Sequence, residues 1–74
     1  MEKFWEGHVV GEFLGYGNGR IYQLSDGSRW QQQGLTDEPA YRNAPKARLL
    51  RKSATDARFL DVEGTSGIVQ VQPL

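Results

Sequence analysis

The sequence predicts an all-β domain, a small and partly open SH3-like barrel of five to six antiparallel strands. Short runs that alternate apolar and polar residues recur between glycine-rich turns, and no apolar rhythm of 3.6 residues is sustained. With 74 residues the chain has room for only one core, so we expect a single domain over residues 1–74. An open sheet of this size would expose its edges and one apolar face, which favours closure. An OB-like barrel is the alternative, although OB barrels usually run longer and often carry a helix between strands three and four.

Composition limits the setting of the domain. Hydrophobic residues make up 38% of the chain and aromatic residues 11%, which is too rich in core-forming side chains for a disordered segment. The chain has no cysteine, so packing and backbone pairing must stabilise it without disulfides or thiolate metal sites. Charged residues interrupt the first ten positions, and nowhere do about 18 apolar residues run together. We therefore expect a cytoplasmic protein with no membrane segment.

The N-terminal half predicts one long strand followed by a hairpin. Residues 8–14 have strand character, and the neighbouring Gly7 and Gly11 indicate a bend or bulge. Residues 15–19 hold three glycines and predict a flexible connection that no strand crosses.

The hairpin joins residues 20–24 to residues 28–32 through Ser25-Asp26-Gly27. A two-residue loop would place Tyr22 and Trp30 on opposite faces of the hairpin. A three-residue loop, with Gly27 in the left-handed conformation, places the two rings opposite each other, and we favour it. We expect Trp30 to lie in the core.

The C-terminal half predicts a loop and three strands. Residues 34–45 contain two prolines and no sustained pattern, so we expect a loop, with one helical turn opening at Thr36. Residues 46–51 form the next strand, with Ala47 and Leu49 facing inward. Residues 58–63 and 68–72 then form a second hairpin through residues 64–67, and Pro73 ends the pairing. Its expected inward residues are Leu60, Val62, Val69 and Val71.

A set of spaced residues resembles a family of small bacterial β-barrel domains to which no activity is assigned. The resemblance covers roughly residues 11 to 74, and its most specific part is the hairpin with Trp30 and Gln32. It rests on Tyr22-x-Leu24-x-x-Gly27-x-x-Trp30-x-Gln32, on Tyr41, on Pro45-x-Ala47-x-Leu49, on Leu60-x-Val62-x-Gly64, and on Val69-x-Val71. The resemblance implies a compact β module. Similarity to SH3 peptide-binding domains is weaker, because no acidic run lies in the first loop, and Pro-rich ligands are not expected.

Charge is unevenly distributed although the net charge is zero. Residues 39–55 carry five basic side chains and no acid, whereas the segments on either side are acidic. Together with Tyr41, this segment has the composition of a surface that follows phosphates and stacks a base. The alternative is that Lys46 and Arg48 protect a barrel edge from pairing with another chain. The isoelectric point of about 6.6 argues against a nucleic-acid domain. The basic residues are Arg42, Lys46, Arg48, Arg51 and Lys52.

Enzyme chemistry finds little support in the sequence. Gly15-x-Gly17-x-Gly19 superficially resembles a phosphate loop, but a strand and not a helix is expected to follow it. His8 has no cysteine or second histidine with which to bind a metal. Asp26 and Ser28 are needed by the hairpin turn. We therefore expect a protein with no catalytic, metal or cofactor site.

The expected function is noncatalytic binding on the outside of the barrel, because a barrel of few strands fills its interior with its own side chains. Of Phe4 and Trp5, one should be buried and the other exposed. Protein–protein interaction through loop and edge aromatics is the first hypothesis, and binding of single-stranded nucleic acid or RNA through residues 42–52 is the alternative. The oligomeric state is left open. The candidate partner-binding residues are Trp5, Tyr16, Tyr41, Arg42, Lys46, Arg48, Arg51 and Lys52.

Overall fold

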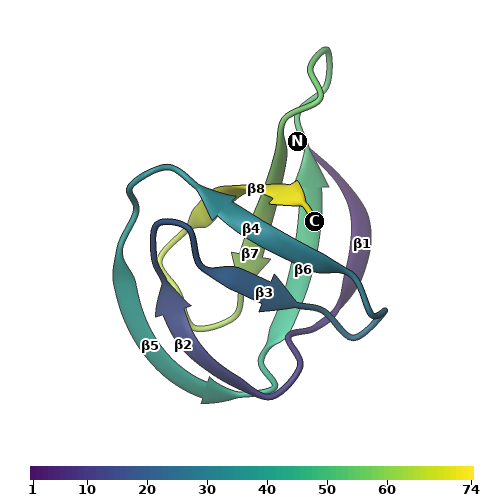
Figure 1. The fold of residues 1–74 in the computed structure, drawn as a ribbon. Helices are drawn as coiled ribbons and strands as arrows, with labels where there is room; N and C mark the ends of the chain where they lie inside the picture. Colours follow the sequence, from purple (N-terminus) through teal and green to yellow (C-terminus); the bar gives the residue numbers. More distant parts are fainter.

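A computed structural model describes all 74 residues as eight antiparallel strands with no helix (Figure 1). A six-stranded sheet has the order β1-β6-β7-β8-β4-β3, and β2 and β5 form a separate two-stranded sheet. The chain contains no helix that is long and apolar enough to cross a membrane. The strands are β1 (Glu2–His8), β2 (Glu12–Tyr16), β3 (Ile21–Gln23), β4 (Arg29–Gln33), β5 (Glu38–Asn43), β6 (Lys46–Arg51), β7 (Arg58–Val62) and β8 (Ile68–Pro73).

Four of these strands are halves of two longer, bent strands. β1 pairs with β6 and β2 pairs with β5, so residues 2–16 run antiparallel to residues 38–51 along both halves. Both segments turn at the same corner. There the Val9 N–H donates to the Pro45 carbonyl at 3.0 Å, and the Ala44 N–H donates to the Gly11 carbonyl at 2.7 Å. Gly11 and Ala44 have positive φ there, of 75° and 48°. This shared corner curls the sheet into a barrel.

The barrel closes at one short contact between the two ends of the large sheet. Val9 forms an isolated bridge with Leu24. The Val10 N–H donates to the Gln23 carbonyl at 2.8 Å, and the Ser25 N–H donates to the His8 carbonyl at 2.9 Å. Counting each bent strand once, six strands surround the core, and the predicted small, partly open all-β barrel is confirmed. The chain has no helix of the kind that the OB-like alternative often carries.

The core is one cluster of twelve buried residues drawn from strands all around the barrel. The predicted inward faces of β6, β7 and β8 are confirmed, and Trp30 is 7% exposed, as expected of a core residue. Burial of an aliphatic or aromatic side chain contributes about 1.5–3 kcal/mol. The cluster consists of Val9, Phe13, Tyr16, Tyr22, Leu24, Trp30, Ala47, Leu49, Leu60, Val62, Val69 and Val71.

The three-residue hairpin loop is also confirmed. Tyr22 lies opposite Trp30, and Gly27 has a φ of 89°. The Leu24 N–H donates to the Ser28 carbonyl at 2.9 Å, which closes the loop. The Asp26 carboxylate accepts a hydrogen bond from the hydroxyl and another from the N–H of Ser28, and these bonds lower the pKa of Asp26.

Four expectations about the strands and loops are wrong. The strand expected over residues 8–14 is split at the corner, and β2 runs on to Tyr16, inside the segment expected to be a flexible connection. Residues 34–45 hold no helical turn but contain β5, which accepts Pro39 because it pairs with β2 alone and needs no second row of donors. Pro73 does not end the pairing, since it lies opposite Trp30 and the next N–H, of Leu74, donates to the Arg29 carbonyl.

Candidate functional site

The aromatic residues expected on the surface divide into buried and exposed ones. Tyr16 is 1% exposed, so its predicted place at a partner surface is wrong. Its ring packs edge-on against Phe13, with the ring centroids 5.9 Å apart. Trp5 is half-buried and packs on the core while Phe4 is exposed, so the expected burial of one of these two rings is met only in part. Tyr41 is 79% exposed.

The Tyr16 hydroxyl connects β2 to the turn between β7 and β8. It accepts a hydrogen bond from the Val62 N–H at 3.0 Å and donates to the Gly67 carbonyl at 2.9 Å. The Thr65 hydroxyl lies 3.1 Å from the same oxygen. Burial raises the pKa of Tyr16 above the ordinary tyrosine value. This side chain is a structural link and is not available to a partner.

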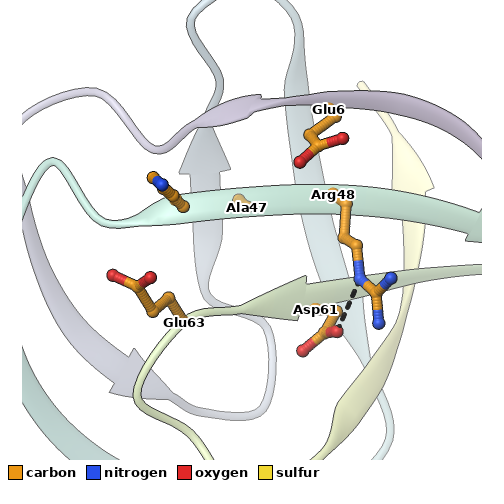
Figure 2. A pocket seen from close by; sticks show the side chains of 6 residues that line it. Glu6, Ala47, Arg48, Asp61 and Glu63 are labelled. Carbon is orange, nitrogen blue, oxygen red and sulfur yellow. Dashed lines mark hydrogen bonds and ion pairs between the residues drawn. The ribbon is translucent and has the colours of Figure 1, made fainter.

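The basic segment is interleaved with acids in space. β6 lies between β1 and β7, so the interpretation of Lys46 and Arg48 as edge protection is wrong. Figure 2 shows Arg48 beside Asp61, and the Arg48 Nε lies 2.9 Å from an Asp61 carboxylate oxygen. Glu2 from β1 and Glu63 after β7 face two more arginines, Arg51 and Arg42, each at 3.9 Å. Neighbouring carboxylates therefore offset the positive charge of the segment.

A small hollow lies on this charged face and holds about 130 Å³. Three carboxylates and two cations line it over the backbone of Ala47, and Figure 2 shows Glu6 from β1, Arg48 from β6 and Asp61 from β7, with Glu63 just after β7. A hydrogen bond from Lys3 lowers the pKa of Glu6, and Arg48 and Lys46 lower it further. The hollow is smaller than the roughly 300 Å³ at which small-molecule sites begin. The geometry does not favour a ligand or a nucleic acid strand here.

The remaining residues with candidate chemistry are separated or used by turns. No group of three or more His, Cys, Asp and Glu side chains is placed to hold a metal ion. His8 is exposed at the end of β1. The glycine-rich turn, closed by the hydrogen bond from the Arg20 N–H to the Gly17 carbonyl, leads into β3 and not into a helix. No phosphate-binding helix N-terminus is formed at that turn.

An apolar groove between β2 and β3 is the candidate functional site. It holds about 310 Å³, at the lower end of the range for ligand pockets, and six of its nine lining residues are hydrophobic. Val10, Leu14 and Ile21 line it with side chains that are 45%, 46% and 45% exposed. Phe13 and Tyr22 line it from below as buried core residues. The groove is therefore an opening in the barrel wall with the core as its floor.

The groove exists because β2 and β3 do not pair with each other. Two backbone bonds, from Ser25 to His8 and from Val10 to Gln23, join the chain just before β2 to the end of β3, and β2 then pairs with β5 while β3 pairs with β4. The β2–β5 register shifts between Phe13 and Gly15, where Leu14 alone lies opposite Ala40 and Tyr41 of β5, and Leu14 is exposed where its neighbours are buried. The two strands thus form the two walls of the groove.

Gln32, a buried polar residue that the sequence did not single out as a site, fixes the β3 wall. Its side-chain oxygen accepts from the Tyr22 hydroxyl at 2.6 Å and from the Gly17 N–H at 2.9 Å. Its side-chain nitrogen donates to the Thr36 carbonyl at 2.8 Å. Burial raises the pKa of Tyr22 to about 12, so this hydroxyl remains a donor across the neutral pH range.

Glu12 and Arg20 are the charged side chains of the groove, and neither forms an ion pair within the chain. The Arg20 Nη1 donates to the Gly15 carbonyl at 2.9 Å, which holds the guanidinium at the groove. Glu12 also lines a neighbouring hollow together with Tyr41, Arg42 and Asn43. Two predicted partner-binding residues, Tyr41 and Arg42, therefore adjoin the groove.

No family model, no curated protein and no solved structure matches the chain. The resemblance to small bacterial β-barrel domains stays a prediction, and the interpretation of the site rests on its geometry.

Proposed function

We propose that this chain is a noncatalytic protein-interaction module that binds its partner through the β2–β3 groove. The observation that carries the proposal is the convergence of Val10, Leu14 and Ile21, three half-exposed aliphatic side chains, on one groove. An apolar hollow rimmed by polar groups is typical of a binding site, whereas apolar residues scattered singly over a surface are ordinary. The binding chemistry is mainly aliphatic, and Tyr41, which lines the neighbouring hollow, supplies an exposed ring beside it.

The setting that fits this role is a reducing cytoplasm, since the chain contains no cysteine and needs no oxidising compartment to fold. Binding of single-stranded nucleic acid is the weaker hypothesis. The acids beside Arg42, Arg48 and Arg51 offset the charge that phosphate contacts require.

Site-specific photo-crosslinking in cells that make the protein tests the proposal. A photo-reactive amino acid replaces Leu14 in the groove in one form and Ile68, an exposed aliphatic residue on β8, in another. We expect a discrete crosslinked protein from position 14 and none from position 68, and we expect Ile21→Lys to abolish it in a chain that is still folded. Identical products from both positions, or none from position 14, would contradict the proposal. Titration with a short single-stranded oligonucleotide at low salt checks the alternative.

A further inference from the structure

We infer that the occupant of the groove is a short extended segment of the partner that adds its backbone to the open edge of β3. The inference deepens the proposed function and rests on it. It is carried by the direction of the β3 backbone groups, by a comparison of the free edges of the barrel, and by the charges at the groove.

The backbone of β3 presents unpaired hydrogen-bonding groups to the groove. In an antiparallel ladder, alternate residues direct their N–H and C=O groups toward the partner strand and away from it. The Arg20 carbonyl accepts from the Gln32 N–H and the Leu24 N–H donates to the Ser28 carbonyl, so these residues face β4. Ile21 and Gln23 therefore direct their backbone groups to the other edge. Of these groups, the Gln23 carbonyl is used by Val10, and no strand pairs with β3 on that side.

The free edges of β1 and β5 are protected against strand addition, and on β2 the Gly15 carbonyl already accepts from the Arg20 guanidinium, whereas the β3 edge has no such protection. The β1 edge carries a bulge between Lys3 and Trp5 and an ion pair from Lys3 to Glu6. β5 contains Pro39, and the Glu38 carboxylate binds Ser66 across it. Charges, bulges, prolines and covering loops are the usual means by which proteins prevent pairing at an edge.

The β3 edge carries Ile21 and has no proline, bulge or ion pair. Its three residues set the length of the segment that it can pair, which is about three residues. An added strand at this position is β-augmentation, in which backbone bonds supply affinity and side-chain pockets supply specificity.

The charges at the groove define the chemistry of the segment. Glu12 and Arg20 both line the groove without ion pairs, so a complementary segment carries one cationic and one anionic residue around a central aliphatic side chain. That aliphatic side chain lies against Leu14 and Ile21. An apolar ligand without a peptide backbone would cover the aliphatic side chains of the groove but would form no hydrogen bonds with the backbone N–H and C=O of Ile21.

Peptide titration followed by the amide resonances of the labelled domain tests the inference. The probes are acetyl-Lys-Val-Thr-Ile-Thr-Val-Glu-amide and the same peptide with its two charged residues exchanged. Each is titrated to about 5 mM, at which a complex with a Kd near 1 mM is mostly formed. We expect the largest shifts at the Ile21 and Gln23 amides and unequal affinities for the two charge orders. Glu12→Gln should reduce that inequality. Ile21→Lys should abolish binding, and Ile68→Lys should leave it unchanged.

Two N-methylated forms of the better peptide separate strand addition from simple apolar contact. One is methylated at the central isoleucine nitrogen and the other at the preceding threonine nitrogen. Because alternate amides of an added strand face β3, one methylation should weaken binding at least tenfold and the other should not. Equal binding of both forms would overturn strand addition while leaving the groove as a binding site. No shift at Ile21 with either charge order would also overturn it, and the crosslinking result would still decide the proposed function.

Discussion

Replacing Tyr16 with phenylalanine removes a buried hydroxyl that accepts one hydrogen bond and donates another, a role that the sequence alone does not predict. The change leaves the Val62 N–H without its acceptor at 3.0 Å, whereas the exposed Gly67 carbonyl keeps the Thr65 hydroxyl at 3.1 Å. A buried polar group left unpaired costs about 1–3 kcal/mol. We expect a loss of about 2 kcal/mol in the free energy of unfolding. A domain of this length has about 4–11 kcal/mol in total, so the variant should fold but melt about 8–16 °C lower.

Urea denaturation and thermal melting of Tyr16→Phe and Tyr41→Phe measure this effect. Tyr41 is exposed and its hydroxyl forms no hydrogen bond within the chain, so its variant should unfold within about 0.5 kcal/mol of the parent. The slope of unfolding free energy against urea should be unchanged in both variants, because neither alters the surface exposed on unfolding. If Tyr16→Phe were as stable as Tyr41→Phe, the assignment of Tyr16 as a structural link would be wrong.

Three further predictions follow from the backbone, the buried tyrosines and the charged face. Gly15→Ala should unfold the domain or lower its free energy of unfolding, measured by urea denaturation, by several kcal/mol, because the new Cβ would meet the Glu38 carbonyl and the residue has positive φ. Gly11→Ala also has positive φ but its Cβ would lie in open space, so it should lower the free energy of unfolding by about 1–3 kcal/mol. Tyrosine ionises at about pH 10 in the unfolded chain, whereas Tyr22 has a pKa of about 12 in the folded domain, so the free energy of unfolding should fall as pH rises from about 10 toward about 12. Urea midpoints that stay constant over this range would contradict the prediction. Arg48→Ala removes one exposed ion pair and should change the urea-derived stability by less than about 1 kcal/mol.

Local chemistry was sufficient to predict the hairpins. The register that places Tyr22 opposite Trp30 follows from the three residues of the loop and from the one glycine that accepts positive φ. The inward faces of β6, β7 and β8 follow from a period-two alternation over five or six residues, which Leu50, Phe59 and Ile68 interrupt without changing its phase. These features depend on neighbours in the sequence, so a single chain reveals them.

Pairing between segments that are distant in the sequence could not be predicted from local patterns. β5 has prolines in and beside it and no clear alternation, and it becomes a strand only because β2, some 25 residues earlier, offers it an edge. The bend that divides residues 2–16 depends likewise on the Ala44–Gly11 hydrogen bond across the corner. Propensity indicated loops at both places, and tertiary pairing overrode it.

The candidate site was predicted in part. Tyr41 and Arg42 lie beside the groove, as the sequence suggested for a partner surface, but Tyr16 does not, because its hydroxyl finds partners 46 and 51 residues away. The exposure of Ile21 was implied by alternation, since it lies out of phase with Tyr22. Ile21 shares a groove with Val10 and Leu14 because β2 pairs with β5 while β3 pairs with β4, and no local sequence pattern predicts that choice of partners.

The walls of the groove are anchored to different parts of the barrel, and this keeps it open. Gly15 lets β2 approach the β5 backbone closely, and the Tyr16 hydroxyl ties the end of β2 to the β7–β8 turn. On the other wall, Gln32 holds Tyr22 and the glycine turn to β4. Closing the gap between β2 and β3 would break buried hydrogen bonds on one side, at about 1–3 kcal/mol for each group left unpaired. Two exposed backbone edges would gain bonds that water already supplies, each worth about 1 kcal/mol net. The folded barrel therefore retains an unpaired edge beside aliphatic side chains, and a partner strand can pair with the Ile21 backbone groups without breaking a backbone pair of the barrel.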